Sequence, residues 1–144
     1  MDIRNISTLS LEEKIGQLFF IGVPTDSVDE TTRRLMADIR PGGICLFARN
    51  IKEARQTRDL LDELRSLAAI APFLSVDQEG GLVDRIKRII GPMPAGARIS
   101  NPEIAEAQAE IIAAALRILG FNMDFAPVVD VVDEPRWQTF TCLA

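Results

Sequence analysis

The sequence predicts an α/β fold in which about four parallel strands alternate with helices. Three observations predict it: four short apolar runs, helical patterns between them, and glycine or proline where the elements end. The apolar runs carry few polar side chains, which is typical of parallel strands covered on both faces. With 144 residues, of which 47 % are hydrophobic, the chain is long enough for one domain with a core.

The elements follow one another in a regular order. Ser10 and Glu13 have the spacing of a capping box, which predicts a helix over 10–18. Further helices are predicted over 26–39, 51–69 and 101–119, the last with Pro102 at its first position and Gly120 at its end. The strands are predicted at 19–23, 44–47, 73–76 and 124–131.

Polar residues follow the predicted strands at their carboxyl ends. They are Pro24-Thr25, Arg49-Asn50, Asp77-Gln78-Glu79 and Asp130. This pattern is typical of the active face of a (β/α) barrel, whereas a doubly wound sheet binds ligands only at its switch point. A closed barrel has eight strands. The predicted fold class is therefore the first half of a TIM-type (β/α) barrel.

Composition excludes several classes of function. The net charge of −5 and the lack of a basic cluster argue against a nucleic-acid partner. No run is long enough to span a membrane and the first residues do not resemble a signal peptide, so a cytoplasmic protein is expected. Cys45 and Cys142 fit no metal or redox spacing, Cys45 is expected to be a buried core thiol, and no cofactor is predicted. The chain contains no histidine, so any acid–base chemistry must use other groups.

The segment 73–85 is the strongest candidate for a functional site. Its apolar strand is followed by Asp77 and Glu79, which point to the same side because strand side chains alternate. Two acids at the end of a buried strand are costly unless they are hydrated, paired or used. Gly80-Gly81 predicts a sharp turn or a close approach of the backbone to another group. Taken alone, the segment would fit an ordinary solvated turn equally well.

Four stretches carry a resemblance to a known family. They are LSLEEKIGQLFFIG (9–22), GGICLFARNI (42–51), LSVDQEGGLVDR (74–85) and LGFNMDFAPVVDV (119–131). In this order and spacing they resemble the N-terminal barrel domain of glycoside hydrolase family three, in its β-N-acetylhexosaminidase branch. On this basis residues 1–144 form a partial domain of that kind, family-like over 1–131, with a divergent terminus at 132–144.

The resemblance implies a retaining glycosidase that releases terminal N-acetylglucosamine, often from cell-wall fragments, as in peptidoglycan recycling. It places sugar binding on Asp77 and Arg85. Glu79 is expected to pair with Arg85 or with backbone N–H groups of the Gly-Gly turn. Glu79 and Asp77 are not expected to be the catalytic carboxylate pair, because neighbouring positions on one strand cannot flank a glycosidic bond.

The terminal segment departs from the family pattern. An arginine that touches the sugar in the family is replaced here by Gln138 or displaced to Arg136. The nucleophile and the acid/base are expected beyond residue 144, so the chain alone is expected to be inactive. Arg49 and Asp130 are further supporting candidates at the edge of the site.

Two other functions remain open from the sequence. One is a non-catalytic carbohydrate-binding or assembly half-barrel that completes its sheet with a partner chain. The other is a barrel enzyme in which Asp77, Glu79 and Asp130 bind Mg²⁺ through their carboxylate oxygens. In every case the unpaired edges of a half-barrel and its open inner face are expected to favour self-association.

Overall fold

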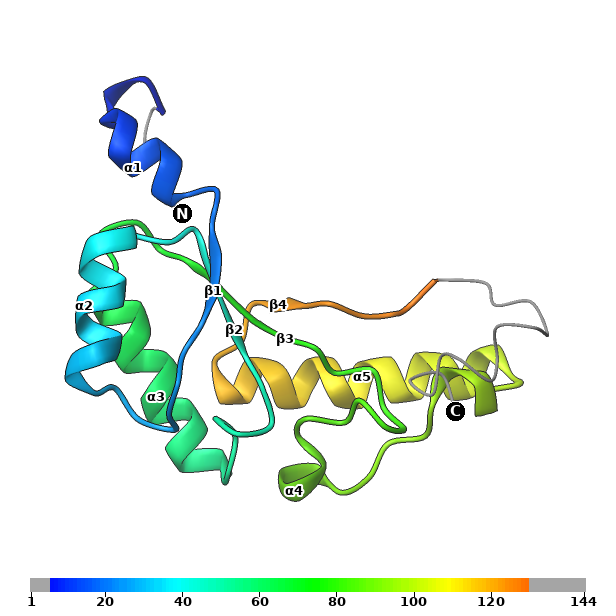
Figure 1. Ribbon diagram of the computed structural model, residues 1–144. Coiled ribbons are helices and arrows are strands. Elements are labelled where there is room, and N and C mark those ends of the chain that lie inside the picture. The colour runs from blue at the N-terminus through cyan, green and yellow to red at the C-terminus, as the bar shows by residue number, and fades with distance from the viewer. Residues whose placement is uncertain (1–5, 130–144) are drawn as a thin grey trace, which may run out of the picture.

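The computed structural model describes residues 6–129, which form one four-stranded parallel sheet with helices between the strands (Figure 1). The strands lie side by side in sequence order and are β1 (Phe20–Gly22), β2 (Gly43–Leu46), β3 (Phe73–Val76) and β4 (Met123–Asp124). The helices are α1 (Leu11–Gly16), α2 (Glu30–Ile39), α3 (Ala54–Leu67), α4 (Lys87–Ile90) and α5 (Pro102–Leu119). Single 3₁₀ turns lie at Ile6–Thr8 and Gly96–Arg98. The predicted arrangement of four parallel strands is confirmed.

Capping side chains fix several helix ends where the sequence predicts them. At the start of α1 the Glu13 N–H donates to Ser10 Oγ at 3.2 Å, and the Ser10 N–H donates to Glu13 Oε2 at 2.9 Å. Asn101 caps α5 by accepting the Glu103 N–H at 2.8 Å. Gly120 ends α5 with a φ of +102°, a left-handed conformation that costs glycine little.

Other helix boundaries differ from the prediction. The first helix ends at Gly16 instead of residue 18, and α3 begins at Ala54 instead of residue 51. The second begins at Glu30 instead of residue 26, because Asp29 serves as its N-cap and accepts the Thr32 N–H at 2.7 Å. The short helix α4 was not predicted, because four residues are too few to show a helical period.

The fourth strand is shorter than predicted. β4 pairs with the end of β3 over two residues, and the Phe125 N–H then donates to the Val76 carbonyl at 2.9 Å. Residues 126–129 are not in a strand, and Pro127 has no N–H with which to extend the ladder. The predicted strand positions 130 and 131 lie outside the described residues.

Helices cover one face of the sheet. Figure 1 shows α2, α3 and α5 on the same side of the strands. The strand residues that point toward them are fully buried: Ile44, Leu46, Leu74 and Val76. They pack in one core with the apolar stripes of α3 and α5, which include Leu60, Leu61, Leu64, Ile112 and Leu116. Burying each such side chain contributes about 1.5–3 kcal/mol, so this face holds the domain together.

The alternate strand positions form an open face, which we call the phenylalanine face. Phe20, Phe73 and Phe125 are 43 %, 51 % and 44 % exposed. The Phe20 ring stacks on Phe73 with 6.1 Å between ring centroids and meets Phe125 edge-on at 5.7 Å. Coverage of both sheet faces was predicted, but within residues 6–129 no helix packs on this one. In a complete barrel it would be the interior.

Candidate functional site

The parallel strands bring the predicted Asp77, Arg49 and Asn50 to one edge of the sheet, together with Asp124, which was predicted to begin its strand instead of ending it. Asp77 follows β3, Arg49 and Asn50 follow β2, and Asp124 is the last residue of β4. The registers of the three strand pairs are continuous from β1 to β4, so these carboxyl ends lie together. This is the edge at which barrel enzymes bind their substrates.

Asn50 ties the ends of the first two strands together. Its side chain is fully buried, and Nδ2 donates to the carbonyl oxygens of Val23 at 3.0 Å and Thr25 at 2.6 Å. Its Oδ1 accepts the Phe47 N–H at 2.9 Å. The Asn50 amide thus satisfies backbone groups of loops that have no strand partner.

An ion pair joins the two residues to which sugar binding was assigned. Arg85 Nη2 donates to Asp77 Oδ2 at 3.0 Å, and the two side chains are 24 % and 27 % exposed. Arg85 Nε is buried and has no hydrogen-bond partner in the described part of the chain. The carboxylate can accept hydrogen bonds and the planar guanidinium can donate them. This combination is suited to a ligand that carries hydroxyl groups on adjacent carbon atoms.

Gln78 holds the segment that carries Arg85. This side chain is 1 % exposed, and its Oε1 accepts the backbone N–H groups of Arg85 at 2.8 Å and Ile86 at 3.1 Å. Its Nε2 donates to the buried Asp84 at 2.9 Å, and the other Asp84 oxygen accepts the Met93 N–H at 2.8 Å. These bonds fix the backbone on which the guanidinium stands.

Gln78 and Asp84 were not predicted to have a role in the site. A signal for Gln78 was present: it alternates with Asp77 and Glu79, so its amide must turn to the opposite, buried side of the strand. Buried amides are hydrogen-bonded, which would have indicated a structural partner nearby.

The glycines at 80 and 81 make the predicted sharp turn. Their φ angles are +86° and +60°, and the N–H groups of Glu79 and Gly80 both donate to the Val83 carbonyl. A side chain on Gly80 would collide with the carbonyl oxygen of Pro94. Both parts of the expectation, a turn and a close backbone approach, are confirmed.

Glu79 is close enough to Asp77 to be affected by its charge, as expected for acids on the same side of an extended segment. Burial and the neighbouring Asp77 raise the pKa of Glu79 to about 7, against an opposing effect of Arg85. Of the two partners predicted for Glu79, the first is wrong, because Arg85 forms its ion pair with Asp77 and not with Glu79. The N–H groups of the glycine turn at residues 80 and 81 donate to the carbonyls of Val83 and Met93, not to the Glu79 side chain. Burial also raises the pKa of Asp124, whose Oδ1 accepts the Gln78 N–H at 3.0 Å.

Arg49 lies at the same edge but takes part in other contacts. Its Nη2 lies 3.4 Å from the Val23 carbonyl oxygen, and its guanidinium stacks 4.8 Å from the centre of the Phe47 ring. Cys45 is part of β2, and burial raises the pKa of its thiol, while its interaction with Ser75 lowers it. This thiol is partly exposed on the open side of the sheet and is not part of the core, so the prediction of a buried core thiol is wrong.

Three predicted site residues cannot be placed. Asp130, Arg136 and Gln138 lie outside the described residues, so the convergence of Asp130 with Asp77 and the sugar contact by Arg136 or Gln138 remain predictions. Within residues 6–129, no cluster of three or more His, Cys, Asp or Glu side chains is arranged to hold a metal ion. The helices of the same region are too short or too polar to span a bilayer.

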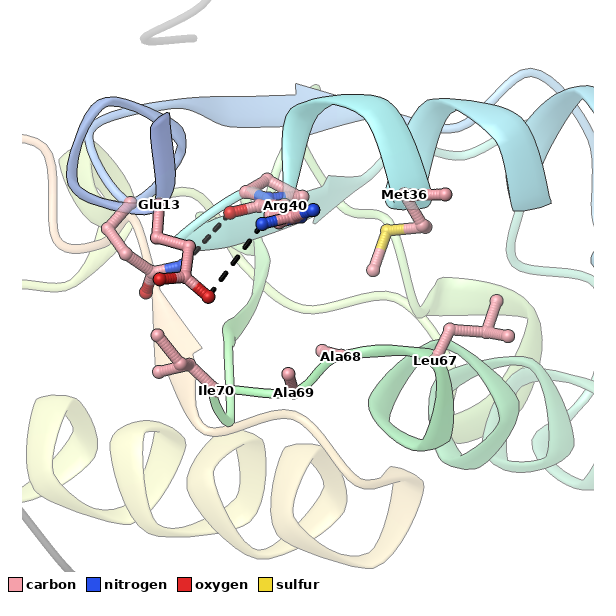
Figure 2. A pocket seen from close by; sticks show the side chains of 10 residues that line it. Glu13, Met36, Arg40, Leu67, Ala68, Ala69 and Ile70 are labelled. Carbon is pink, nitrogen blue, oxygen red and sulfur yellow. Dashed lines mark hydrogen bonds and ion pairs between the residues drawn. The ribbon is translucent and has the colours of Figure 1, made fainter. Parts of the chain in front are cut away.

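A pocket of about 270 Å³ lies at the opposite edge of the sheet (Figure 2). Gln17, Pro41 and Ile70, which line it, each precede a strand, so the pocket faces the amino ends. An ion pair between Arg40 and Glu13, at 3.7 Å, borders it. It contains none of the predicted site residues, and barrel enzymes do not use this edge for catalysis.

The chain is similar to curated β-hexosaminidases. It is 35 % identical over 114 residues to the β-hexosaminidase of Thioalkalivibrio sulfidiphilus, covering 73 % of this chain and 33 % of that protein. It is 32 % identical over 126 residues to that of Thiobacillus denitrificans, covering 81 % and 35 %. The chain therefore spans about a third of the length of these relatives.

Solved structures agree with this similarity. A glycoside hydrolase family 3 β-N-acetylglucosaminidase from Paenibacillus superposes with a TM-score of 0.80 at 35 % identity, over 85 % of this chain and 25 % of that one. A family 3 glycosyl hydrolase from Mycobacterium smegmatis superposes with a TM-score of 0.76 at 31 % identity, over 90 % and 39 %. The sequence pattern of the glycosyl hydrolase family 3 N-terminal domain matches residues 10–142. The chain belongs to glycosyl hydrolase family 3 and carries part of its N-terminal barrel domain.

Proposed function

We propose that this chain forms part of the sugar-binding edge of a retaining β-N-acetylhexosaminidase, in which Asp77 and Arg85 bind the terminal N-acetylglucosamine. The ion pair between these residues carries the proposal, because it places an acceptor and several donors side by side at the carboxyl edge of the sheet. The names of the similar proteins, β-hexosaminidase and β-N-acetylglucosaminidase, support the choice of sugar.

The covalent chemistry needs groups that this segment does not supply. A retaining mechanism uses a nucleophile and a separate acid/base. Asp77 and Glu79 are alternate residues on one side of the same extended segment, so they cannot stand on opposite sides of a glycosidic bond. The 144 residues contain no histidine. We assign both catalytic roles to residues outside 1–144, and we expect the 144-residue polypeptide to bind the sugar without hydrolysing it.

The biological setting is part of the same proposal. N-acetylglucosaminides released from the cell wall are the proposed substrates, and the proposed role is the recycling of peptidoglycan fragments in the cytoplasm. The 144-residue polypeptide is proposed to associate with a second copy of itself. The outer edges of β1 and β4 carry no strand partner among the described residues, and the phenylalanine face lies open beside them.

Replacing one carboxylate oxygen tests the sugar site. Asp77→Asn keeps the size of the side chain and removes its charge, and Asp38→Asn makes the same change at an exposed position on α2. We expect Asp77→Asn to weaken N-acetylglucosamine binding by about tenfold to a hundredfold, since a hydrogen bond to a charged group contributes about 1.5–3 kcal/mol. Titration calorimetry measures this loss. Binding that changes by less than twofold in Asp77→Asn would refute the assignment.

A chromogenic N-acetylglucosaminide and light scattering test the remaining parts. We expect no turnover by the 144-residue polypeptide and a mass above that of one chain. Turnover by a monomer would contradict both the placement of the catalytic residues and the self-association.

A further inference from the structure

The pocket at the amino edge of the sheet has a charged end and an apolar end. Figure 2 shows Glu13 and Arg40 together at one end and Met36 and Leu67 at the other, with the segment between α3 and β3 along one side. Most of the remaining lining is apolar, and Glu13 and Arg40 are its two charged residues. At about 270 Å³ the pocket is smaller than the roughly 300–1,000 Å³ typical of pockets for drug-sized ligands, so it suits a small molecule.

The backbone at the charged end of the pocket is held in place by close contacts between α1 and the turn that follows α2. The Gly42 N–H donates to the Gly16 carbonyl at 3.2 Å, and a side chain on either glycine would collide with backbone atoms across this contact. Gln17 Nε2 donates to the Arg40 carbonyl at 2.9 Å. These contacts fix the charged end before a ligand arrives, which lowers the entropy cost of binding.

Arg40 has a backbone conformation that arginine rarely adopts. Its φ is +53°, in the left-handed region, whereas α5 ends in the same region with Gly120. This conformation is costly for a residue with a side chain. In the described part of the chain the Arg40 guanidinium has no hydrogen bond, and its ion pair with Glu13 is loose, with 3.7 Å between nitrogen and oxygen and side chains 56 % and 32 % exposed. Such an exposed pair contributes little to stability, so stability does not explain the arginine at this position.

We propose that this pocket binds a free α-amino acid with an aliphatic side chain, such as leucine. The Arg40 guanidinium donates to the ligand carboxylate, and Glu13 Oε1, which accepts no hydrogen bond within residues 6–129, accepts from the ligand ammonium. These two ligand groups are attached to one carbon atom, so they lie side by side as Arg40 and Glu13 do. The aliphatic side chain lies between Met36 and Leu67. The site is independent of the sugar-binding edge, which lies at the other end of the strands.

Titration calorimetry of the wild-type polypeptide with leucine and three analogues tests the ligand class. Leucinamide lacks the carboxylate, N-acetylleucine lacks the ammonium and glycine lacks the aliphatic side chain, and we expect each to bind about tenfold more weakly than leucine, or weaker still. In nitrogen NMR spectra, leucine should shift the side-chain signals of Gln17 and Arg40. No saturable binding at millimolar leucine, equal binding of any analogue, or shifts that leave Gln17 and Arg40 unmoved would overturn the proposal.

Two variants test the roles of the charged pair. Glu13→Gln keeps the capping box, because glutamine can accept the Ser10 N–H, and Arg40→Asn keeps the turn, because asparagine tolerates the left-handed conformation. Both should weaken leucine binding by about tenfold or more, whereas Glu12→Gln and Arg34→Asn, the same changes at exposed positions outside the pocket, should leave it unchanged.

Thermal unfolding separates a binding role of Arg40 from a structural one. Arg40→Asn should not lower the melting temperature, because asparagine is less strained than arginine at this φ. A clearly lower melting temperature in Arg40→Asn than in Arg34→Asn would show that the arginine serves the fold, and it would overturn the binding role. Leucine binding that is unchanged in Arg40→Asn would overturn it as well.

Discussion

Gln78→Leu removes the side-chain amide that holds the site segment while keeping a side chain of similar volume. In the wild type this amide accepts the N–H groups of Arg85 and Ile86 and donates to Asp84. Leucine can do neither, so two backbone donors and one carboxylate oxygen lose their partners. Ile86 and Asp84 are buried, at 0 % and 4 % exposure, so water reaches them only if the segment moves.

The expected cost follows from these three groups. A buried polar group without a partner costs about 1–3 kcal/mol, and more when it is charged. Arg85 is partly exposed, so its N–H can recover part of the loss from water. We therefore expect Gln78→Leu to lower the free energy of unfolding by about 3–5 kcal/mol, a large share of the 5–15 kcal/mol that is typical of a domain.

Urea unfolding followed by circular dichroism, at one fixed chain concentration, measures this loss. Gln108→Leu is the matched control: the Gln108 side chain donates one hydrogen bond, to the Pro94 carbonyl at 3.0 Å, and its replacement should cost about 1 kcal/mol or less. Gln78→Glu adds a second test, because a carboxylate facing Asp84 should destabilise the fold more at pH 8 than at pH 4. Equal losses in Gln78→Leu and Gln108→Leu would refute the role given to the Gln78 amide.

Three further changes test other parts of the site. Because the pKa of Glu79 rises from 4.5 to about 7 on folding, its contribution to stability is complete below pH 4.5 and is lost as the pH rises to about 7. Urea unfolding should show this fall, at most about 3 kcal/mol, in the wild type and not in Glu79→Gln. Gly80→Ala should lower the free energy of unfolding by about 2 kcal/mol or more in thermal unfolding, because φ is positive at this position and the new methyl group would collide with the Pro94 carbonyl oxygen. Gly96→Ala is the control and should change the free energy of unfolding little, because its methyl group would meet no atom within 4 Å. Asn50→Ala should cost about 2–3 kcal/mol in the same assay, since it removes three hydrogen bonds to backbone groups and leaves only the Val23 carbonyl with another donor, Arg49. A loss below about 1 kcal/mol would contradict that account.

Local patterns in the sequence determined the order of the elements and the place of the site. Short apolar runs, the Ser10–Glu13 capping box and Gly120 each depend on a few neighbouring residues, so they can be recognised in the sequence itself. The same holds for the turn at Gly80-Gly81 and for the shared side of Asp77 and Glu79, which follows from strand alternation. The family resemblance also depends on such short stretches.

Only the tertiary structure decided which groups pair. Asp77 and Glu79 are equivalent by alternation, and the path of the chain after the glycine turn is what brings Arg85 to Asp77. The bonds of Gln78 to Arg85, Ile86 and Asp84 likewise depend on that path, and the bond of Asp124 to the Gln78 N–H spans 46 residues. The exposure of the phenylalanine face also became clear only from the tertiary structure, because the apolar pattern of a strand does not show whether another element packs on each of its two sides. Such pairings are set by the packing of distant segments, which the local sequence pattern does not encode.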